Sequence, residues 1–186
     1  MKNTIQDKTK LVNSVFSKVN KKYDLMNDIM SLGIHRIWKN KFLDWMNPQQ
    51  GNNLIDVASG TGDIAKLYLD KLNNNGHVSC LDENQGMLNL SKKRFNTSLN
   101  IKWICCDAEK LPFKNNYFDY YTISFGIRNV NNMNISLKEA YRVLKPGGRF
   151  LCLEFSKVKS EILNKFYQSY SKSIPILGKL IIGKSE

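Results

Sequence analysis

A glycine-rich segment and a later acid have the residue types and spacing of a cofactor-binding loop. Gly60-Thr61-Gly62 opens the pattern G-x-G-x-x-G/A, and Asp82 stands 20 positions beyond Gly62. Glycines let the backbone approach a ligand closely, and one carboxylate can accept hydrogen bonds from both hydroxyls of a ribose. The pair therefore predicts a site for a nucleoside-containing cofactor, and a dinucleotide and S-adenosylmethionine fit it equally.

Three further segments favour S-adenosylmethionine. Asp56 lies four residues before Gly60, where its carboxylate suits the methionine ammonium. Asp107-Ala108 follows a later apolar run, and an Asp acceptor beside a backbone N–H can bind an adenine edge. Ser124 ends the next such run and is expected to face the cofactor. The predicted cofactor-binding residues are Asp56, Ser59, Gly60, Thr61, Gly62, Asp82, Asp107, Ala108 and Ser124.

Purely structural interpretations of the same residues compete with this prediction. Gly60 and Gly62 could form only a tight turn between a strand and a helix. Asp82 could cap a helix, and Asp107 could form a turn before Pro112. The order and spacing of the segments, taken together, favour the cofactor site over these alternatives.

Alternating apolar segments must position these residues. Short apolar runs predict strands at residues 54–57, 77–81, 101–105, 118–124 and 149–155. Helical spacing of apolar residues predicts helices at 63–72, 86–95 and 135–144, the last one stopped by a turn at Lys145-Pro146-Gly147-Gly148. Apolar strands separated by helices imply an α/β fold with a Rossmann-like, doubly wound, mostly parallel sheet. Such sheets bind ligands at the carboxyl ends of their strands.

Length and composition indicate a single domain, residues 1–186, with no metal site. The N-terminus is polar and no run of about 18 uncharged apolar residues occurs, so we expect a cytoplasmic protein. The cysteines lack C-x-x-C spacing and are expected to be reduced core thiols; they are Cys80, Cys105, Cys106 and Cys152. The net charge of +12 comes mostly from dispersed lysines, which favours a solvated basic surface, then membrane attraction, then specific nucleic-acid binding.

Several longer segments resemble one known family. They are Tyr23-Asp24-Leu25-Met26-Asn27-Asp28, Ser31-Leu32-Gly33-Ile34-His35-Arg36, Asp107-Ala108-Glu109, Ser124-Phe125-Gly126-Ile127-Arg128-Asn129-Val130, Arg142-Val143-Leu144-Lys145-Pro146-Gly147-Gly148 and Leu153-Glu154-Phe155-Ser156. Over nearly its whole length the chain is similar to the ubiquinone/menaquinone biosynthesis C-methyltransferases. The first and fourth segments are the most particular to that family.

The resemblance implies a class I S-adenosylmethionine-dependent methyltransferase that methylates a ring carbon of a polyprenyl benzoquinol, a demethylmenaquinol, or both. It implies cofactor contacts at Thr61, Asp82, Asp107, Ala108 and Ser124. Ser59 stands where the family often has glycine, and a positive φ at Ser59 would be strained. The family continues beyond Glu186 with another helix and two strands, so the chain resembles a truncated member that lacks the last two strands.

Methylation of an aromatic carbon requires electron density at that carbon, which ionisation of a neighbouring hydroxyl supplies. A phenol of pKa about 10 is mostly protonated at neutral pH, so the site must stabilise an oxyanion or remove the proton. We expect Arg128 to contact the quinol oxygen, with Asn129 and Tyr23 as neutral hydrogen-bonding residues. A surface ion pair is the alternative for Arg128. Water, Asp24 or His35 could take the proton, and a packed structural histidine is the alternative for His35.

Three regions are expected along the domain. Residues 1–50 would form a helical cap over the substrate, 51–156 the cofactor-binding α/β core, and 157–186 a helical segment that contacts a membrane or covers the sheet. The expected partners are the lipophilic quinol, the inner face of a membrane through peripheral contact, and a homodimer or a quinone-biosynthesis complex. Three other functions compete: a nicotinamide-dependent reductase, a nucleic-acid methyltransferase and an inactive fragment that binds cofactor.

Overall fold

Strands and helices alternate along the part of the chain that the computed structural model describes, residues 28, 31, 33–95 and 100–156. The strands are β1 (Asn53–Val57), β2 (His77–Asp82), β3 (Ile101–Cys105), β4 (Phe118–Ser124) and β5 (Leu144–Leu153). The helices are α3 (Ile34–Met46), α4 (Asp63–Lys71), α5 (Gln85–Lys92), the 3-10 helix η2 (Ile127–Asn129) and α6 (Met133–Val143). Every strand and helix predicted between residues 54 and 155 is present, and most of their ends lie close to the predicted residues.

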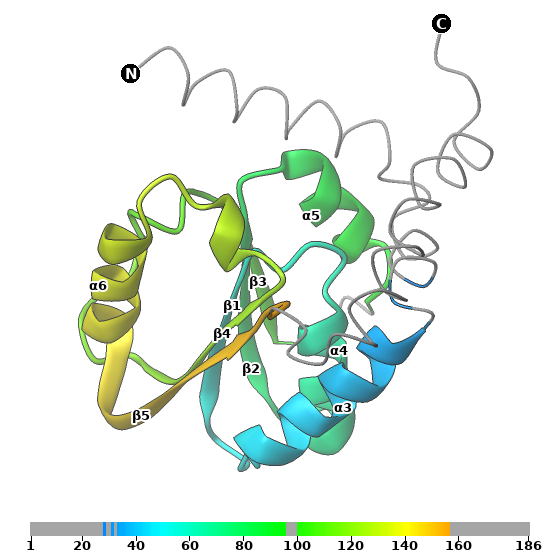
Figure 1. Ribbon diagram of the computed structural model, residues 1–186. Coiled ribbons are helices and arrows are strands. Elements are labelled where there is room, and N and C mark those ends of the chain that lie inside the picture. Colours follow the sequence, from blue (N-terminus) through cyan, green and yellow to red (C-terminus); the bar gives the residue numbers. More distant parts are fainter. Residues whose placement is uncertain (1–27, 29–30, 32, 96–99, 157–186) are drawn as a thin grey trace, which may run out of the picture.

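The strands form one parallel sheet in the order β3-β2-β1-β4-β5 (Figure 1). The chain runs outward from β1 through β2 to β3, and then returns to the other side of β1 as β4. The order therefore reverses between β1 and β4, where the loops diverge at the carboxyl ends and leave room for a ligand. This arrangement confirms the predicted α/β fold with a Rossmann-like, doubly wound sheet.

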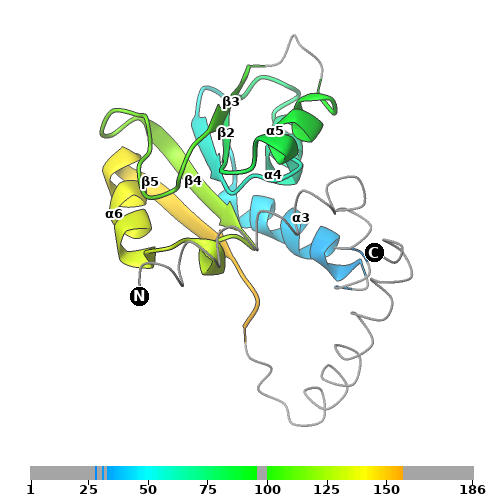
Figure 2. The same cartoon turned by 90° about the horizontal axis from the view of Figure 1, so that it is seen from above.

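Helices cover both faces of this sheet (Figure 2). Successive strand residues point to opposite faces, and neighbouring residues of β1 and β4 accordingly belong to two separate apolar clusters. Leu54 and Tyr120 pack with residues of α3 and α4, whereas Ile55 and Tyr121 pack with residues of α6. Because β1 is buried on both faces, a charged residue in it calls for a functional explanation. Asp56, which is 1% exposed, is such a residue.

The Lys145-Pro146-Gly147-Gly148 segment is a bulge within a strand, and the prediction of a turn before the strand was wrong. Helix α6 ends at Val143, and β5 begins immediately at Leu144. Leu144 pairs with Phe118 and Arg149 pairs with Tyr120, so residues 145–148 bulge out of the ladder. Proline has no N–H to donate, and Gly147 has a φ of +78°, so both residues suit a bulge in a strand at the edge of the described sheet.

Only one of the four cysteines is a fully buried thiol, so the prediction of four core thiols was wrong. Cys80 is buried on β2, whereas Cys106 is half-buried and Cys105 and Cys152 are exposed; all four are free. Cys105 and Cys152 belong to β3 and β5, the two edge strands of the described sheet, and edge strands are covered less completely than central ones. Within residues 28, 31, 33–95 and 100–156, no cluster of acidic, histidine or cysteine side chains is placed to hold a metal ion.

Gly62 and Gly51 provide a matched pair of substitutions. Both have a φ of +81°, which costs an L-residue about 1–2 kcal/mol. A Cβ at Gly62 would lie 2.4 Å from Ser91 Oγ and 2.9 Å from the Phe95 ring, whereas a Cβ at Gly51 would meet nothing within 4 Å. We expect Gly62→Ala to lower the free energy of unfolding by about 1–3 kcal/mol more than Gly51→Ala, measured by urea denaturation. Equal losses would show that contact with α5 does not constrain the turn before α4.

Candidate functional site

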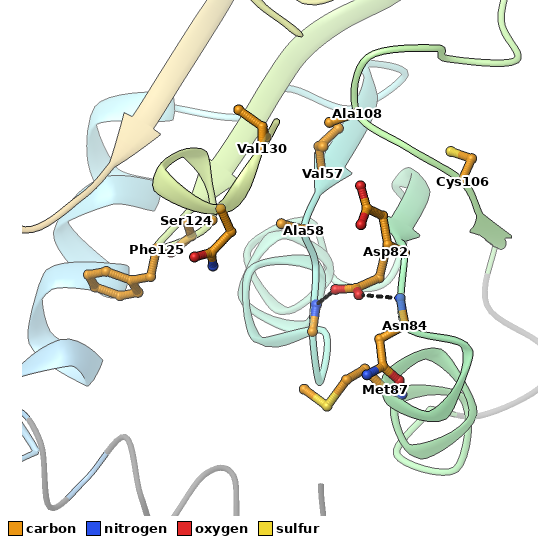
Figure 3. Close-up of a pocket in the computed structure, with 14 residues that line it drawn as sticks. Val57, Ala58, Asp82, Asn84, Met87, Cys106, Ala108, Ser124, Phe125 and Val130 are labelled. Atoms are coloured by element: carbon orange, nitrogen blue, oxygen red, sulfur yellow. Dashed lines mark hydrogen bonds between the residues drawn. The ribbon is translucent and has the colours of Figure 1, made fainter. Parts of the chain in front are cut away.

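A hollow lies at the carboxyl ends of β1, β2, β3 and β4, where the cofactor site is predicted, and we call it the main hollow (Figure 3). Its walls come from separate segments of the chain, each of which follows a strand. Gly60 follows β1, Asp82 ends β2, Ala108 follows β3, and Ser124 ends β4. The structure thus brings together four of the predicted cofactor-binding residues from four strand ends, at the place where a doubly wound sheet binds its ligand.

The carboxylate of Asp82 is held in a fixed orientation at this hollow. The N–H of Gly60 donates to Asp82 Oδ2 and the N–H of Asn84 donates to Asp82 Oδ1, each at 2.9 Å (Figure 3). Burial raises the pKa of Asp82, and the two backbone hydrogen bonds act against that shift. Asn84, not Asp82, caps α5, because Asn84 Oδ1 accepts from the N–H of Met87 at 3.1 Å. Each carboxylate oxygen has a further lone pair, so Asp82 can still bind a ribose diol.

A second, smaller hollow adjoins the first on the side of α3 and α4. The two hollows share Ala58, Gly60, Ser124 and Phe125. The second hollow has a lysine, Lys39, besides its acids Asp56 and Asp63, whereas the charged residues that line the main hollow are two acids, Asp82 and Glu83. The second hollow also contains Ser59 and Thr61 of the glycine loop. A ligand that extends from one hollow to the other would therefore present hydrogen-bond donors to Asp82 at one end and could carry both charges at the end near Lys39 and Asp56.

Asp56 is a buried acid with one unsatisfied oxygen. Its Oδ1 accepts a hydrogen bond of 2.8 Å from Thr122 Oγ1, whereas its Oδ2 is buried and has no partner among the described residues. Burial raises the pKa of Asp56 to about 7, despite the opposing hydrogen bond from Thr122. Ser124 Oγ, at the edge of the same hollow, is also buried and has no partner within the described chain. Buried polar atoms are normally hydrogen-bonded, so both atoms are suited to a polar ligand.

Lys39 supplies a positive charge in the site that was not predicted from the sequence. It belongs to α3, is 7% exposed, and its Nζ lies 2.6 Å from Asp63 Oδ2. Arg94 Nη1 lies 2.9 Å from the other oxygen of Asp63. Burial raises the pKa of Asp63, but the two cations outweigh burial and hold that pKa below its usual value. An ammonium has three N–H donors, so Lys39 can bind a ligand carboxylate while it remains paired with Asp63.

The strained, positive φ angles of the site are not at Ser59, where the sequence raised that possibility, but at the residue before it and at the residue after β4. Ser59 does not have a positive φ, so the serine found where the family often has glycine is unstrained. The neighbouring Ala58 has a φ of +53° and Phe125 has a φ of +55°. Conformations of this kind cost about 1–3 kcal/mol each and cluster at ligand sites. A Cβ at Gly126 would lie 2.4 Å from the Cβ of Ala58, so glycine is required there for the two loops to meet.

Two of the predicted cofactor residues have visible structural roles. Asp107 Oδ1 accepts a hydrogen bond of 2.8 Å from the N–H of Glu109, and only the neighbours of Asp107 line the main hollow. Gly62 caps α4 and lines neither hollow. The contact of Asp107 with adenine stays a prediction, and the structure shows the turn-forming role that was its alternative.

The residues predicted for catalysis differ in whether they line a hollow. Asn129 lines the main hollow, whereas Arg128 lines neither hollow and forms an ion pair with Glu154. His35 is buried, its Nε2 lies 2.9 Å from Asp28 Oδ1, and it also lines neither hollow, which agrees with a structural role. Tyr23 and Asp24 lie outside the described residues. The roles of Arg128, Asn129 and Tyr23 in catalysis therefore stay predictions.

The donors and acceptors of the two hollows fit S-adenosylmethionine. Asp82 is placed for the ribose, while Asp56 and Lys39 offer the opposite charges that a methionine ammonium and carboxylate require. Fold and site together define a Rossmann-like, class I S-adenosylmethionine-dependent methyltransferase.

Known structures of other methyltransferases have the same fold. An S-adenosylmethionine-dependent methyltransferase from Aquifex aeolicus has a TM-score of 0.59 at 22% identity, over 66% of each chain. A putative one from Methanococcus maripaludis has a TM-score of 0.62 at 17% identity, over 85% of this chain and 71% of that one.

Sequence comparison identifies the family. The chain belongs to the ubiE/COQ5 methyltransferase family, whose sequence profile matches residues 2–186. The "Ubiquinone/menaquinone biosynthesis C-methyltransferase UbiE" of Rickettsia prowazekii (strain Madrid E) is 53% identical, over 95% of this chain and 73% of that protein. The mitochondrial "2-methoxy-6-polyprenyl-1,4-benzoquinol methylase" of Dictyostelium discoideum is 46% identical, over 96% of this chain and 67% of that protein. The chain is therefore an S-adenosylmethionine-dependent C-methyltransferase, as the resemblance implied.

Asp82→Asn tests the ribose contact. An amide keeps only one acceptor oxygen and no charge, so we expect the Kd for S-adenosylmethionine to increase about 10–100-fold, the loss that accompanies removal of a charged hydrogen bond. Isothermal titration calorimetry measures the change. Asp70→Asn on the exposed face of α4, outside both hollows, is the matched control and should bind as the wild type does. Equal weakening in both variants would contradict a specific role for Asp82.

Asp56→Asn tests the buried acid through the pH dependence of stability. Burial raises the pKa of Asp56 from 3.8 to about 7, so between these values the folded state holds a proton that the unfolded state has released. The stability of the wild type therefore falls as pH rises from about 4 to 7, and the variant lacks this contribution. We expect the free energy of unfolding of Asp56→Asn, relative to wild type, to rise across that window and level off above it. Urea denaturation at several pH values measures this difference in the free energy of unfolding. A difference that does not change with pH would contradict the raised pKa of Asp56.

Proposed function

We propose that this protein transfers a methyl group from S-adenosylmethionine to a ring carbon of a polyprenyl benzoquinol, a demethylmenaquinol, or both. The names of its relatives supply the class of acceptor. The single structural observation that supports the proposal most is the pair of adjoining hollows, with Asp82 in one and Asp56 and Lys39 in the other. This charge arrangement suits a ligand with a ribose at one end and a zwitterionic amino acid at the other.

The chain's own residues would hold the cofactor from both ends. Asp82 binds the ribose hydroxyls, Lys39 the carboxylate and Asp56 the ammonium of the amino-acid end. When bound, S-adenosylmethionine supplies an electrophilic methyl group on a positively charged sulfur. The residues common to both hollows, among them Ser124 and Phe125, would then lie beside the part of the cofactor between its two ends. The end of β4 is therefore where an acceptor should approach.

The acceptor ring needs a hydrogen-bonding partner for its oxygen and protection from water. Asn129 lines the main hollow five residues beyond the end of β4, where its amide can bind a quinol oxygen. Val130 beside it gives the same wall an apolar surface. A polar group that orients the ring and an apolar wall that excludes water are the two contributions a protein makes to such an alkylation.

The lipophilic tail of the acceptor indicates where in the cell the enzyme meets its substrate. Within the ranges that the structure describes, no helix is long and apolar enough to cross a bilayer. A polyprenyl chain partitions into membranes, so we propose peripheral contact with the inner face of a membrane in the cytoplasm. A homodimer and a quinone-biosynthesis complex stay predictions.

Transfer of a labelled methyl group tests the proposed function. The protein is incubated with methyl-labelled S-adenosylmethionine and either a short-chain demethylmenaquinol or a short-chain methoxy-benzoquinol. We expect label on a ring carbon of at least one acceptor, detected by mass spectrometry. Calorimetric titrations with NADH and with nucleic acid are the controls for the two competing functions. Heat from NADH alone would indicate a reductase, steeply salt-dependent binding of nucleic acid would indicate a nucleic-acid enzyme, and cofactor binding without transfer would indicate an inactive fragment.

A further inference from the structure

Phe125 connects the cofactor hollows to a cluster of three aromatic rings. Its ring centroid lies 6.5 Å from that of Trp38 on α3 and 4.8 Å from that of Phe155, which follows β5. Trp38 and Phe155 are themselves 5.9 Å apart in an edge-to-face arrangement. In Figure 3 the Phe125 side chain points away from Asp82 and toward α3. We call Trp38, Phe125 and Phe155 the aromatic cluster.

The aromatic cluster is open to a ligand. Trp38 is 38% and Phe155 is 40% exposed, a large fraction for side chains that already pack on one another. Phe125 has the left-handed φ of +55°, so its position is imposed by its surroundings and is not its relaxed conformation. Flat apolar rings beside a cofactor site form a surface on which an aromatic acceptor can stack or meet edge to face.

An ion pair with one unsatisfied oxygen borders this cluster. The Arg128 guanidinium lies 5.3 Å from the centre of the Phe155 ring and pairs with Glu154 Oε1, which also accepts the N–H of Phe155 at 2.8 Å. Glu154 Oε2 is buried and has no hydrogen-bond partner in the described part of the chain. The N–H of Phe125 donates to Leu153 O at 2.7 Å, which holds Glu154 beside the end of β4. A buried carboxylate oxygen without a partner indicates a ligand with a hydrogen to donate.

The two members of the pair differ in what they can do for a quinol. Arginine has five N–H donors and no acceptor, so Arg128 cannot receive a hydroxyl proton. Glu154 can accept it on Oε2 while Arg128 and the Phe155 N–H bind Oε1. The ion pair on its own would be a surface contact worth about 1 kcal/mol or less, which leaves the buried oxygen unexplained.

We propose that Glu154 receives the hydroxyl proton of the acceptor ring and that Arg128 positions Glu154, with the aromatic cluster as the wall for that ring. The inference rests on the proposed function and deepens it. The O–H bond breaks as its proton passes to Glu154 Oε2, and the electron pair of the oxygen increases electron density at the neighbouring ring carbon. That carbon bonds to the methyl group, and the electron pair of the broken carbon–sulfur bond stays on sulfur. The ring carbon then loses a proton to water, the electron pair of that C–H bond restores the aromatic ring, and the C=O electron pair returns to oxygen. Glu154 returns its proton to that oxygen, so one proton is released in total.

Glu154→Gln is the central variant, because glutamine keeps the size and an acceptor for Arg128 but cannot take a proton. At pH 7.5 we expect its kcat to fall about 100-fold or more, the range typical of a lost general base. Its Kd for S-adenosylmethionine should stay within about 2-fold of wild type, since Glu154 lines neither cofactor hollow. The decisive measurement is the pH profile at saturating cofactor. The kcat of the variant should rise nearly tenfold per pH unit toward the pKa of the acceptor, about 10, because an ionised acceptor needs no base.

Further variants separate this role from a structural one. Glu154→Asp keeps a carboxylate and should retain the wild-type pH profile at a lower kcat. Arg128→Lys should lower kcat less than Glu154→Gln does, also with the wild-type profile. Asp44→Asn, which removes the carboxylate of the exposed Asp44–Lys71 pair outside both hollows, is the matched control and should be fully active.

Each result supports or overturns the inference. An active wild type with an unchanged kcat or pH profile in Glu154→Gln would overturn it and leave the proposed function in place. If Glu154→Gln fails to bind cofactor, the dependence of kcat on pH in Glu154→Asp decides. The same dependence as in the wild type supports the inference, and a tenfold rise of kcat per pH unit contradicts it. If the wild type binds S-adenosylmethionine but methylates neither quinol, the proposed function itself fails, and the inference fails with it.

Discussion

The hydrogen bond from the N–H of Gly60 to Asp82 Oδ2 joins the loop after β1 to the end of β2, at 2.9 Å. It depends on the register of the sheet, which pairs Val57 with Leu81 and so brings the two strand ends level. The N–H of Ser59 donates to Leu81 O at 2.9 Å and continues this connection by one residue. The loop cannot move without losing both bonds. The shape of the main hollow and the orientation of the Asp82 carboxylate therefore follow from the pairing of β1 with β2.

The second constraint is the burial of charge beside this loop. Asp56, Asp63 and Lys39 lie close together at the smaller hollow, and Arg94 completes the pairing of Asp63. Removing charges from water costs several kcal/mol per ion unless partners compensate, so such a group is retained for a purpose other than stability. Here Asp63 is satisfied on both oxygens, whereas Asp56 has a buried oxygen without a partner among the described residues. A zwitterionic amino-acid end would supply the missing partner.

Local structure in this protein is predictable from its sequence, whereas contacts between distant segments are not. Strand and helix positions followed from apolar periodicity, and the glycine loop with Asp82 followed from spacing. Lys39 was missed because nothing in the sequence distinguishes a buried lysine among 28 basic residues until α3 packs against Asp63 at the start of α4. Arg128 and Glu154 are 26 positions apart in the sequence, so only the pairing of β4 with β5 shows that Glu154 forms an ion pair with the Arg128 guanidinium. The bulge at Gly147 and the exposed Cys152 depend likewise on the place of β5 at an edge of the described sheet.

A crystal structure of the protein with S-adenosylhomocysteine tests the central claim most directly, because it shows how the two hollows are occupied. We expect both ribose hydroxyls within hydrogen-bond distance of Asp82, and the amino-acid end beside Asp56 and Lys39. The sulfur should lie against the segment of Ser124 and Phe125 that both hollows share. A nucleoside bound away from Asp82, or the ligand in the reverse orientation, would contradict the assignment of the two hollows.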